Sequence, residues 1–348
     1  YKETMSVILS KIKRPFIIAE LSANHNGKIT NIYKLINKAK KSGANAVKIQ
    51  SYTPESMTLD VKNKFFFIKN GPWKGHYLND LYKKGTTPYT WHKKIFDYAK
   101  KKKILCFSTP FDFNAVDLLE KLKVQLYKIA SFEINHIPLL EKIGKTKKPV
   151  IISTGMADIN DIHLAIKTLK KNGSKDIAIL HCISAYPSKS QYYNLNFINR
   201  LKKFNLPIGL SDHTVDNVAA STSVGMGVKI FEKHLRLEAK KGIDSKFSTN
   251  PNNFKNYVDN INLSFNSLGN ENFNRKKFEG DNKKYRRSIF ISKDVLRNDF
   301  ITKENIAVIR PSTGIHPKFY QRILGKKFKI NKKKGSPLKF KHIFEKIR

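Results

Sequence analysis

Two neighbouring apolar segments of this sequence each end in a carboxylate and a histidine. The segment "IGLSDHT" carries Asp212 and His213, and the segment "KIFEKHL" carries Glu232 and His234. A single histidine at the end of a strand is most often a structural residue, but two at matching places in consecutive units indicate a shared task. Neutral imidazoles suit Mn, Fe, Co or Zn. We therefore predict that His213 and His234 hold a divalent metal, with positions left open for water and substrate.

The two carboxylates beside these histidines have no single predicted role. Asp212 and Glu232 could ligate the metal, orient the histidines, or belong to buried ion pairs. The sequence does not choose among the three.

Lysines interrupt two further apolar segments, Lys48 in "AVKIQ" and Lys128 in "LYKIAS". A buried ammonium without a partner is costly. One possibility is an internal ion pair with Glu20 or Glu133, and the other is an anionic ligand. The other strand ends add groups that suit a phosphate: hydroxyls from Thr109, Ser131, Ser153 and Ser211, and backbone N–H groups near Gly155.

Eight strand-like segments must position these side chains, and most neighbours are separated by amphipathic helical patterns. The segments are 16–21, 46–50, 104–110, 126–131, 149–154, 177–184, 208–213 and 229–235. One helix is expected to start at Asp158 and stop at Gly173. This count predicts a (β/α)8 TIM barrel. A doubly wound sheet is the alternative, but no glycine-rich dinucleotide loop follows the first segment.

Catalytic residues of such a barrel lie at the carboxyl ends of the strands. Here all eight segments end in polar groups, which places the candidate residues at one mouth. The strand-end set is Glu20, Asn24, His25, Lys48, Gln50, Ser108, Thr109, Lys128, Ser131, Glu133, Ser153, Thr154, Gly155, Ser184, Tyr186, Ser211, Asp212, His213, Glu232 and His234.

The chain divides into two predicted domains. We expect a catalytic barrel over residues 1–268, a polar linker over 269–284 and a small domain of short strands and tight turns over 285–348. Residues 51–88 form an insertion after the second strand and should help to build the substrate pocket. Its aromatic residues could line that pocket or merely pack the loop down.

Composition limits the class of protein. The net charge of +40 comes mostly from Lys, with only ten Arg among 67 basic residues, spread along the whole chain. Scattered lysine predicts solvated helix faces rather than a nucleic-acid surface, although it would attract anionic substrates. Cys106 and Cys182 lie in apolar segments and are expected to be reduced. No signal-peptide core or membrane span is present, so a cytoplasmic protein is expected.

Several motifs together resemble the sialic acid synthase family. They run in order along the whole barrel: "IIAELSANHNG", "AVKIQ", "FSTPFD", "YKIASFE", "STGMA", "AYP", "GLSDHT" and "EKH". The tail "IRPSTGIHPKFYQRILGKK" is similar to the C-terminal antifreeze-like (SAF) domain of that family. The insertion "NGPWKGHYLNDLYKKGTTPYTWHKKIF" is most similar to the pseudaminic acid synthase branch.

The resemblance implies a transferase that condenses phosphoenolpyruvate with an open-chain N-acetylated amino sugar and releases phosphate. For that branch the sugar is 2,4-diacetamido-2,4,6-trideoxy-L-altrose. His213 and His234 would hold the metal, most often Mn²⁺, with Mg²⁺ or Co²⁺ as alternatives. Glu20 and Glu133 would handle protons or sugar hydroxyls. The phosphoenolpyruvate site would comprise Lys48, Thr109, Lys128, Ser131, Ser153, Gly155 and Ser211.

The same resemblance implies a sugar site and a partner. Gln50, Tyr186 and Asp244 belong to the candidate substrate-binding set, and Arg310 would reach the sugar of a partner subunit in a domain-swapped homodimer. Ser184 stands where the sialic acid branch has Asn and receives no role.

Alternative functions stay open at this point. The first is synthesis of N-acetylneuraminate from N-acetylmannosamine, or of legionaminate from a related sugar. The second is formation of a 3-deoxy-ulosonic acid phosphate, which needs extra basic residues for a phosphorylated sugar. The third is non-enzymatic nucleic-acid binding, which leaves the strand-end set unexplained.

Overall fold

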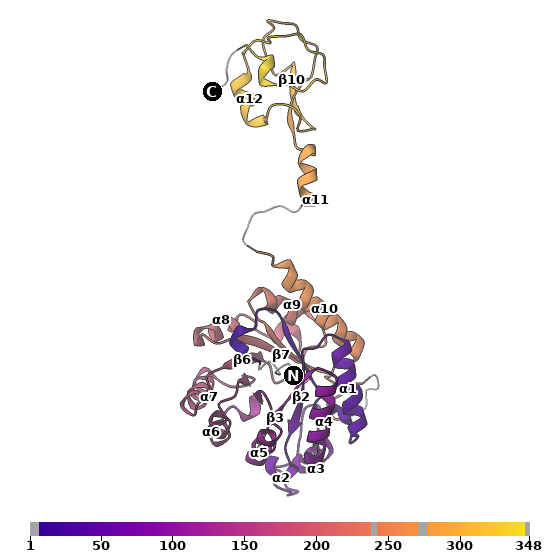
Figure 1. Cartoon of the computed structure of the whole chain (residues 1–348), viewed down its shortest axis with the longest axis vertical. Coiled ribbons are helices and arrows are strands. Elements are labelled where there is room, and N and C mark those ends of the chain that lie inside the picture. The colour runs from indigo at the N-terminus through magenta and orange to yellow at the C-terminus, as the bar shows by residue number, and fades with distance from the viewer. Residues whose placement is uncertain (1–6, 238–241, 271–276, 345–348) are drawn as a thin grey trace. The chain divides into compact units, whose positions relative to one another are not determined.

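The barrel predicted from the sequence is present. The structure is a computed structural model that describes residues 7–237, 242–270 and 277–344. Within this part of the chain, eight parallel strands close in sequence order, with β8 paired to β1 (Figure 1). They are β1 (Phe16–Glu20), β2 (Ala46–Ser51), β3 (Leu105–Pro110), β4 (Tyr127–Ile129), β5 (Val150–Ser153), β6 (Ile177–Cys182), β7 (Ile208–Asp212) and β8 (Ile230–His234).

Alternation along each strand separates two cores, because successive side chains point into the barrel and out toward the helices. A buried cluster inside the barrel contains Leu9, Ile18, Ala46, Phe107, Leu126, Ile151, Ala178, Leu180 and Ile230. Two positions after several of these residues, the next inward residue is polar: Glu20, Lys48, Thr109, Lys128, Ser153 and Glu232. A floor of apolar side chains therefore lies beneath a polar mouth.

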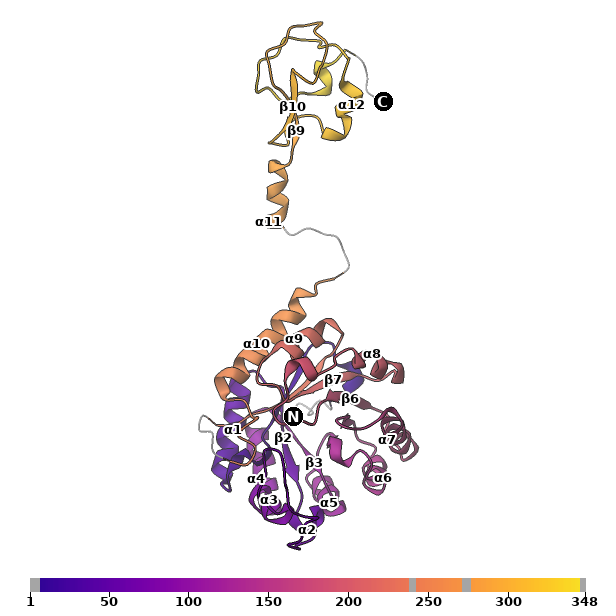
Figure 2. The ribbon, with the colours of Figure 1, turned by 180° about the vertical axis from the view of Figure 1, so that it is seen from behind.

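Helices surround the strands, as both views of the ribbon show (Figures 1 and 2). They are α1 (Ile29–Lys41), α4 (Tyr89–Lys101), α5 (Phe113–Lys121), α6 (Ile137–Lys145), α7 (Ile159–Lys171), α8 (Phe197–Leu201), α9 (Val218–Gly225) and α10 (Pro251–Ser267). Short 3-10 turns accompany them: η1 (Leu9–Lys11), η2 (Ser22–His25), η3 (Ser131–Glu133), η4 (Ser190–Tyr192) and η5 (Lys202–Phe204). The expected cap is present, since the Asp158 carboxylate accepts the N–H groups of Asn160 (2.7 Å) and Asp161 (2.8 Å).

The insertion after β2 has its own local structure. It contains α2 (Pro54–Met57) and α3 (Leu78–Gly85), joined by a hairpin over residues 66–78. Antiparallel pairing of Phe67 with Tyr77 holds this hairpin, and Gly71 and Gly75 turn its tip with φ of 86° and 90°. Such left-handed backbone favours glycine.

The chain divides into two compact units. The first is Tyr1–Gly269, which contains the barrel, and the second is Asn270–Arg348. The second unit contains the antiparallel pair β9 (Ser288–Ile291) and β10 (Ile306–Ile309), with α12 (Tyr320–Ile323), η7 (Pro317–Phe319) and η8 (Phe340–His342). Part of the expected linker, 271–276, lies outside the described residues. Residues 277–284 of it are helical, because α11 (Lys277–Gly280) and η6 (Asp281–Tyr285) form there.

Two compositional expectations can be compared with the structure. Cys106 and Cys182 are both buried and free. Within the described residues, no helix combines the length and apolarity needed to cross a bilayer.

Candidate active site

Most of the side chains predicted from the sequence share one cavity of about 430 Å³ at the carboxyl ends of the strands. Those that line it are Glu20, Lys48, Gln50, Lys128, Ser131, Glu133, Ser153, Tyr186, Ser211, His213, His234 and Asp244. Their convergence follows from strand alternation, because an inward residue at the last position of each strand faces the same mouth.

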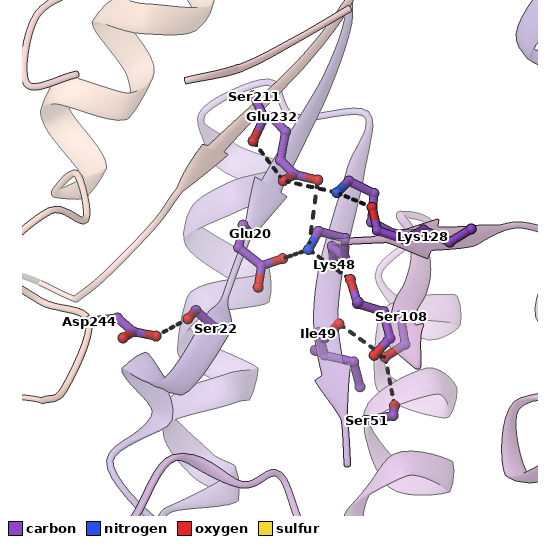
Figure 3. A network of polar contacts seen from close by, with 12 residues as sticks. Glu20, Ser22, Lys48, Ile49, Ser51, Ser108, Lys128, Ser211, Glu232 and Asp244 are labelled. Carbon is purple, nitrogen blue, oxygen red and sulfur yellow. Dashed lines mark hydrogen bonds and ion pairs between the residues drawn. The ribbon is translucent and has the colours of Figure 1, made fainter. Parts of the chain in front are cut away.

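A network of buried charges forms the polar side of the cavity (Figure 3). Lys48 Nζ lies 2.6 Å from Glu20 Oε2 and 3.7 Å from Glu232 Oε2. Lys128 Nζ lies 3.9 Å from Glu232 Oε1, which also accepts the Ser211 hydroxyl at 3.1 Å. Lys48 therefore forms the ion pair with Glu20 that the sequence left open, and it also faces the cavity.

Burial and neighbouring charges shift the pKa values of these groups in opposite directions. Burial lowers the pKa of Lys128, whereas the pKa of Lys48 is raised, because burial is outweighed by the carboxylates of Glu20 and Glu232. Burial works against the charge of Glu232, but Lys128 and Lys48 hold the pKa of that carboxyl below its ordinary value. Two ammonium groups near a carboxylate make this side attractive to an anion.

Two further carboxyls titrate near neutrality. Burial raises the pKa of Glu20 to about 7 despite Lys48, and burial also raises the pKa of Glu133 to about 7. A carboxyl whose pKa lies near the working pH can both give and take a proton. Perturbed carboxyls in a cavity are candidates for acid–base work.

The raised pKa of Glu133 predicts a pH-dependent cost to stability. Its folded value of about 7 exceeds the ordinary 4.5, so the folded state binds more protons between these values and loses stability as pH rises through them. Replacing Glu133 by Gln should therefore stabilise the protein by about 1–3 kcal/mol at about pH 8 and hardly at all near pH 4.5. Thermal melts at both pH values measure this. An equal change at both would contradict the raised pKa.

The two histidines lie side by side, with ring centroids 5.5 Å apart. His213 Nδ1 lies 2.8 Å from the carbonyl oxygen of Ile183, to which it donates as the Nδ1–H tautomer, leaving Nε2 free as an acceptor. Burial lowers the pKa of His213 to about 4 and the pKa of His234 well below its ordinary value. Both rings are therefore neutral near pH 7, as metal ligands must be.

Several buried polar atoms of the cavity have no hydrogen-bond partner among the described residues. They include His234 Nδ1, Ser153 Oγ, Glu133 Oε2, Glu20 Oε1 and Trp73 Nε1. Buried polar atoms in folded proteins are almost always satisfied, so unsatisfied ones in a cavity indicate a ligand. The His234 nitrogen and the neutral rings fit a metal ion. No group of three or more His, Cys, Asp or Glu side chains is placed to hold one in the described ranges, so two nitrogens would leave positions for substrate.

Asp212 belongs to a different environment, because it points outward from β7. Its carboxylate pairs with Lys233 at 3.0 Å and accepts the N–H of Thr214 at 2.8 Å. Lys233 also donates to the Thr214 carbonyl oxygen at 2.8 Å. Of the three roles left open for Asp212, the structure places it in a buried ion pair behind the histidines, whereas Glu232 faces the cavity.

Three residues of the expected substrate site do not line the cavity: Thr109, Gly155 and Arg310. The same holds for these members of the wider strand-end set: Asn24, His25, Ser108, Thr154, Ser184 and Asp212. Thr109 accepts a hydrogen bond from Lys48 Nζ at 3.0 Å. Gly155 has φ of 51°, and a Cβ there would lie 2.3 Å from Ser131 Cβ, so this glycine permits the close approach of the Ser131 loop. Arg310 is exposed in the second unit, directly after β10. The first two support residues that do face the cavity.

Cys182 is a cavity residue that sequence reasoning treated only as core. It lies at the carboxyl end of β6, and Ala178 and Leu180 on the same strand belong to the inner cluster. The period of two therefore points Cys182 inward, a signal that was available in the sequence. Burial raises the pKa of its thiol to about 11, which keeps the sulfur protonated at neutral pH.

The other side of the cavity is apolar and comes largely from the insertion. Ile68, Trp73, Leu78 and Leu81 line it, together with Phe247. The sequence predicted that this insertion helps to form the pocket, and the lining confirms it. Phe65 is different, since 79% of it is exposed. Trp73 therefore takes the first of the two roles that the sequence allowed, and Phe67, which packs on Tyr77 with ring centroids 5.1 Å apart, takes the second. Phe65 takes neither.

Comparison with known proteins assigns both parts of the chain. Residues 35–273 match the model of the NeuB family, and residues 286–343 match the SAF domain. The first match covers most of the barrel, and the second covers the unit that contains β9 and β10.

Named relatives and solved structures agree with these matches. The chain is 41% identical to the pseudaminic acid synthase of Campylobacter jejuni, with 94% of this chain and 96% of the relative covered. It is 40% identical to the pseudaminic acid synthase of Helicobacter pylori, with 94% and 97% covered. The N-acetylneuraminic acid synthetase of Leptospira borgpetersenii, solved with citrate, superposes with a TM-score of 0.68 at 31% identity over 77% of this chain and 90% of that one.

Proposed function

The chain belongs to the NeuB family, and we propose that it condenses phosphoenolpyruvate with 2,4-diacetamido-2,4,6-trideoxy-L-altrose to give pseudaminic acid and phosphate. One observation carries the proposal: a single cavity joins two lysines and three serine hydroxyls to two neutral histidines and an apolar wall. The first set suits an anionic enolpyruvate, and the last suits a sugar poor in hydroxyls. The names of the relatives from Campylobacter and Helicobacter support the choice of product.

Phosphoenolpyruvate would bind on the charged side of the cavity. Lys48 and Lys128 face its phosphate and carboxylate, and Ser131, Ser153 and Ser211 supply hydroxyl donors. The unsatisfied Ser153 hydroxyl is the clearest vacant donor of this group among the described residues. In the reaction, C3 of phosphoenolpyruvate bonds to the aldehyde carbon, water adds at C2, and the C2–O bond to phosphate breaks.

His213 and His234 would hold a divalent cation, which we propose to be Mn²⁺. When bound, it supplies Lewis-acid polarisation of the sugar aldehyde. The histidines themselves contribute neutral nitrogen lone pairs, and Ile183 orients one ring. This carbonyl contact fixes the tautomer.

Proton transfer is assigned to Glu20 and Glu133. Both carboxyls line the cavity, and burial brings the pKa of each to about 7. One protonated carboxyl can deliver the proton that converts the aldehyde oxygen to a hydroxyl, and one ionised carboxyl can accept the proton of the attacking water. We also infer a cytoplasmic location, since both cysteines are free and buried.

Mass detection of the nonulosonic acid tests the function directly. The protein is incubated with phosphoenolpyruvate, Mn²⁺ and either the diacetamido trideoxy sugar, the precursor of legionaminic acid or N-acetylmannosamine at equal concentration. We expect the first sugar to give the highest kcat/KM, because a site built for a methyl and an acetamide matches hydroxyls poorly. Preference for either other sugar would assign the chain to the corresponding branch, and no product with any sugar would overturn the proposal.

The barrel mouth carries exposed apolar side chains that support a dimeric enzyme. Phe132 follows β4, Met156 follows β5, and Val215 and Val218 follow β7, with exposures of 59%, 56%, 72% and 62%. We propose that the SAF unit of a partner subunit covers this rim in a domain-swapped homodimer and that Arg310 thereby reaches the sugar. Exposed apolar residues grouped at a mouth favour such a cover.

Subunit mixing tests the swap. Arg310→Ala should raise KM for the sugar about 10-fold or more while KM for phosphoenolpyruvate stays unchanged, because only one substrate loses a contact. A heterodimer of Arg310→Ala and His213→Ala chains contains one barrel with intact histidines facing one intact SAF unit. Activity should therefore partly return after subunit exchange. Verified heterodimers without recovery would show that Arg310 does not act across subunits.

A further inference from the structure

The hairpin over residues 66–78 borders the cavity, but none of the catalytic groups assigned above belongs to it. Backbone hydrogen bonds join its two arms and its tip. In two of them, both at 2.9 Å, the Ile68 N–H donates to the His76 carbonyl and the Gly75 N–H donates to the Ile68 carbonyl. Leu78 N–H donates to the Phe66 carbonyl at 2.8 Å. The hairpin is therefore a formed element with one residue, Trp73, presented at its end.

Trp73 lies one aromatic ring away from both histidines of the cavity. Its ring centroid is 5.8 Å from Tyr186 and 5.9 Å from Phe247. Tyr186 in turn lies 4.3 Å from His213, and Phe247 lies 5.1 Å from His234. A sugar whose aldehyde is held near the histidines must extend toward this aromatic layer, so Trp73 faces the end of the sugar that does not react.

The indole also has a polar neighbour in the buried carboxylate of Asp244. Burial raises the pKa of Asp244, while hydrogen bonds from the Ser22 hydroxyl and the Ala23 N–H oppose the rise. The Trp73 indole nitrogen is buried as well and has no hydrogen-bond partner among the described residues. Figure 3 shows Asp244 turned toward Ser22. Trp73 thus combines an apolar face with an unsatisfied N–H donor. An acetamido group requires this pairing: an apolar surface for its methyl and a donor for its carbonyl oxygen.

The chemistry of this wall discriminates between sugars. A hydroxyl placed against Ile68, Leu78 and the ring face of Trp73 would lose its hydrogen bonds to water without gaining others. A methyl group in the same place gains apolar contact. The wall therefore favours a deoxy, acetamido-bearing end of the substrate over a hydroxylated one.

We propose that the 66–78 hairpin, through Trp73, is the specificity element that reads the distal deoxy and acetamido groups of the sugar. This inference rests on the proposed function, because it takes the diacetamido trideoxy sugar as substrate. Trp73 acts by contact with the substrate end remote from the reacting carbon. It does not take part in the bond changes.

Selectivity, rather than activity alone, tests the proposal. In Trp73→Ala, kcat/KM for the diacetamido sugar should fall about 10- to 100-fold, mainly through KM, and kcat/KM for N-acetylmannosamine should change less than about 3-fold. KM for phosphoenolpyruvate should stay constant. Phe65→Ala is the matched control: this aromatic residue lies just before the same hairpin, is 79% exposed, and should leave the ratio of the two sugars unchanged.

The result that overturns the proposal is an unchanged ratio in Trp73→Ala, because a residue that only packs the loop would affect both sugars alike. Trp73→Gln, which keeps an N–H donor but removes the aromatic surface, gives a second measurement if the alanine variant melts below the assay temperature. Its ratio should fall as well, and an unchanged ratio there would also refute the proposal. Failure of the proposed function is seen separately, since the unmodified enzyme would then not prefer the diacetamido sugar.

Discussion

His213→Ala should abolish both activity and metal binding. The variant removes one of two neutral imidazoles that lie side by side in the cavity, with ring centroids 5.5 Å apart. Loss of a partner that merely orients a ligand already costs about 10- to 100-fold in metal affinity, so loss of a ligand itself should cost more than about 100-fold. Titration of metal-free protein with Mn²⁺ and metal analysis of the purified variant measure this independently of turnover.

His92→Ala is the matched control for this variant. His92 is as buried as His213, and burial lowers its pKa to about 4 as well, but its Nε2 lies 2.7 Å from the Ser51 hydroxyl outside the cavity. Both variants should lose about 1–3 kcal/mol of stability, because each leaves a buried hydrogen-bond partner unsatisfied. Only His213→Ala should lose metal. A His213→Ala enzyme that keeps chelator-sensitive turnover would refute the metal assignment.

Lys48→Met should combine the loss of phosphoenolpyruvate binding with a large loss of stability. Lys48 is the ammonium that approaches Glu20 at 2.6 Å and Glu232 at 3.7 Å. Its removal leaves two buried carboxylates facing each other, which should cost about 3–5 kcal/mol. It also removes a positive charge from the anion side, so kcat/KM for phosphoenolpyruvate should fall by about 100-fold or more.

A second buried lysine separates these two effects. Lys233 also forms a buried ion pair on a barrel strand, at 3.0 Å from Asp212, but it points away from the cavity. Lys233→Met should therefore cost similar stability while the dissociation constant for phosphoenolpyruvate changes less than about 3-fold. Denaturation and calorimetric binding measure the two quantities.

Lys128→Met provides a milder version of the same test. Its ammonium lies 3.9 Å from Glu232, a longer contact than that of Lys48, so less stability should be lost. Binding of phosphoenolpyruvate should still weaken. Equal phosphoenolpyruvate affinity in the Lys48, Lys128 and Lys233 variants would show that phosphoenolpyruvate does not bind on this side of the cavity.

The sequence alone determined the barrel and the faces of its strands. Apolar residues at Ile18, Ala46 and Ile230 are followed two positions later by Glu20, Lys48 and Glu232. Because side chains alternate with a period of two, this spacing puts both kinds of residue inside the barrel and the polar ones at its mouth. The family motifs lie at the same strand ends, so they too could be recognised from the sequence.

Contacts between strands were decided only by the tertiary structure. The sequence allowed Lys48 to pair with Glu20 or Glu133, and the register of β1 with β2, which sets Glu20 beside Lys48, selects Glu20. The register of β7 with β8 likewise sets Asp212 beside Lys233 and so selects the partner of this outward-facing carboxylate. Spacing along one strand fixes the face of a side chain, but its partner depends on how neighbouring strands are staggered around the barrel.

The apolar side of the cavity was the least predictable from the sequence. Phe65 and Trp73 belong to the same aromatic insertion, yet one is exposed and the other contacts Tyr186 and Phe247. No helix period governs the segment between α2 and α3, where both residues lie. Composition therefore gives its aromatic content but no direction for any one side chain. The turn at Gly71 and Gly75, and the antiparallel pairing behind it, aim Trp73 at the cavity. Its partners there, Tyr186 and Phe247, lie in the loops after β6 and β8, and only the folded chain brings them to this hairpin.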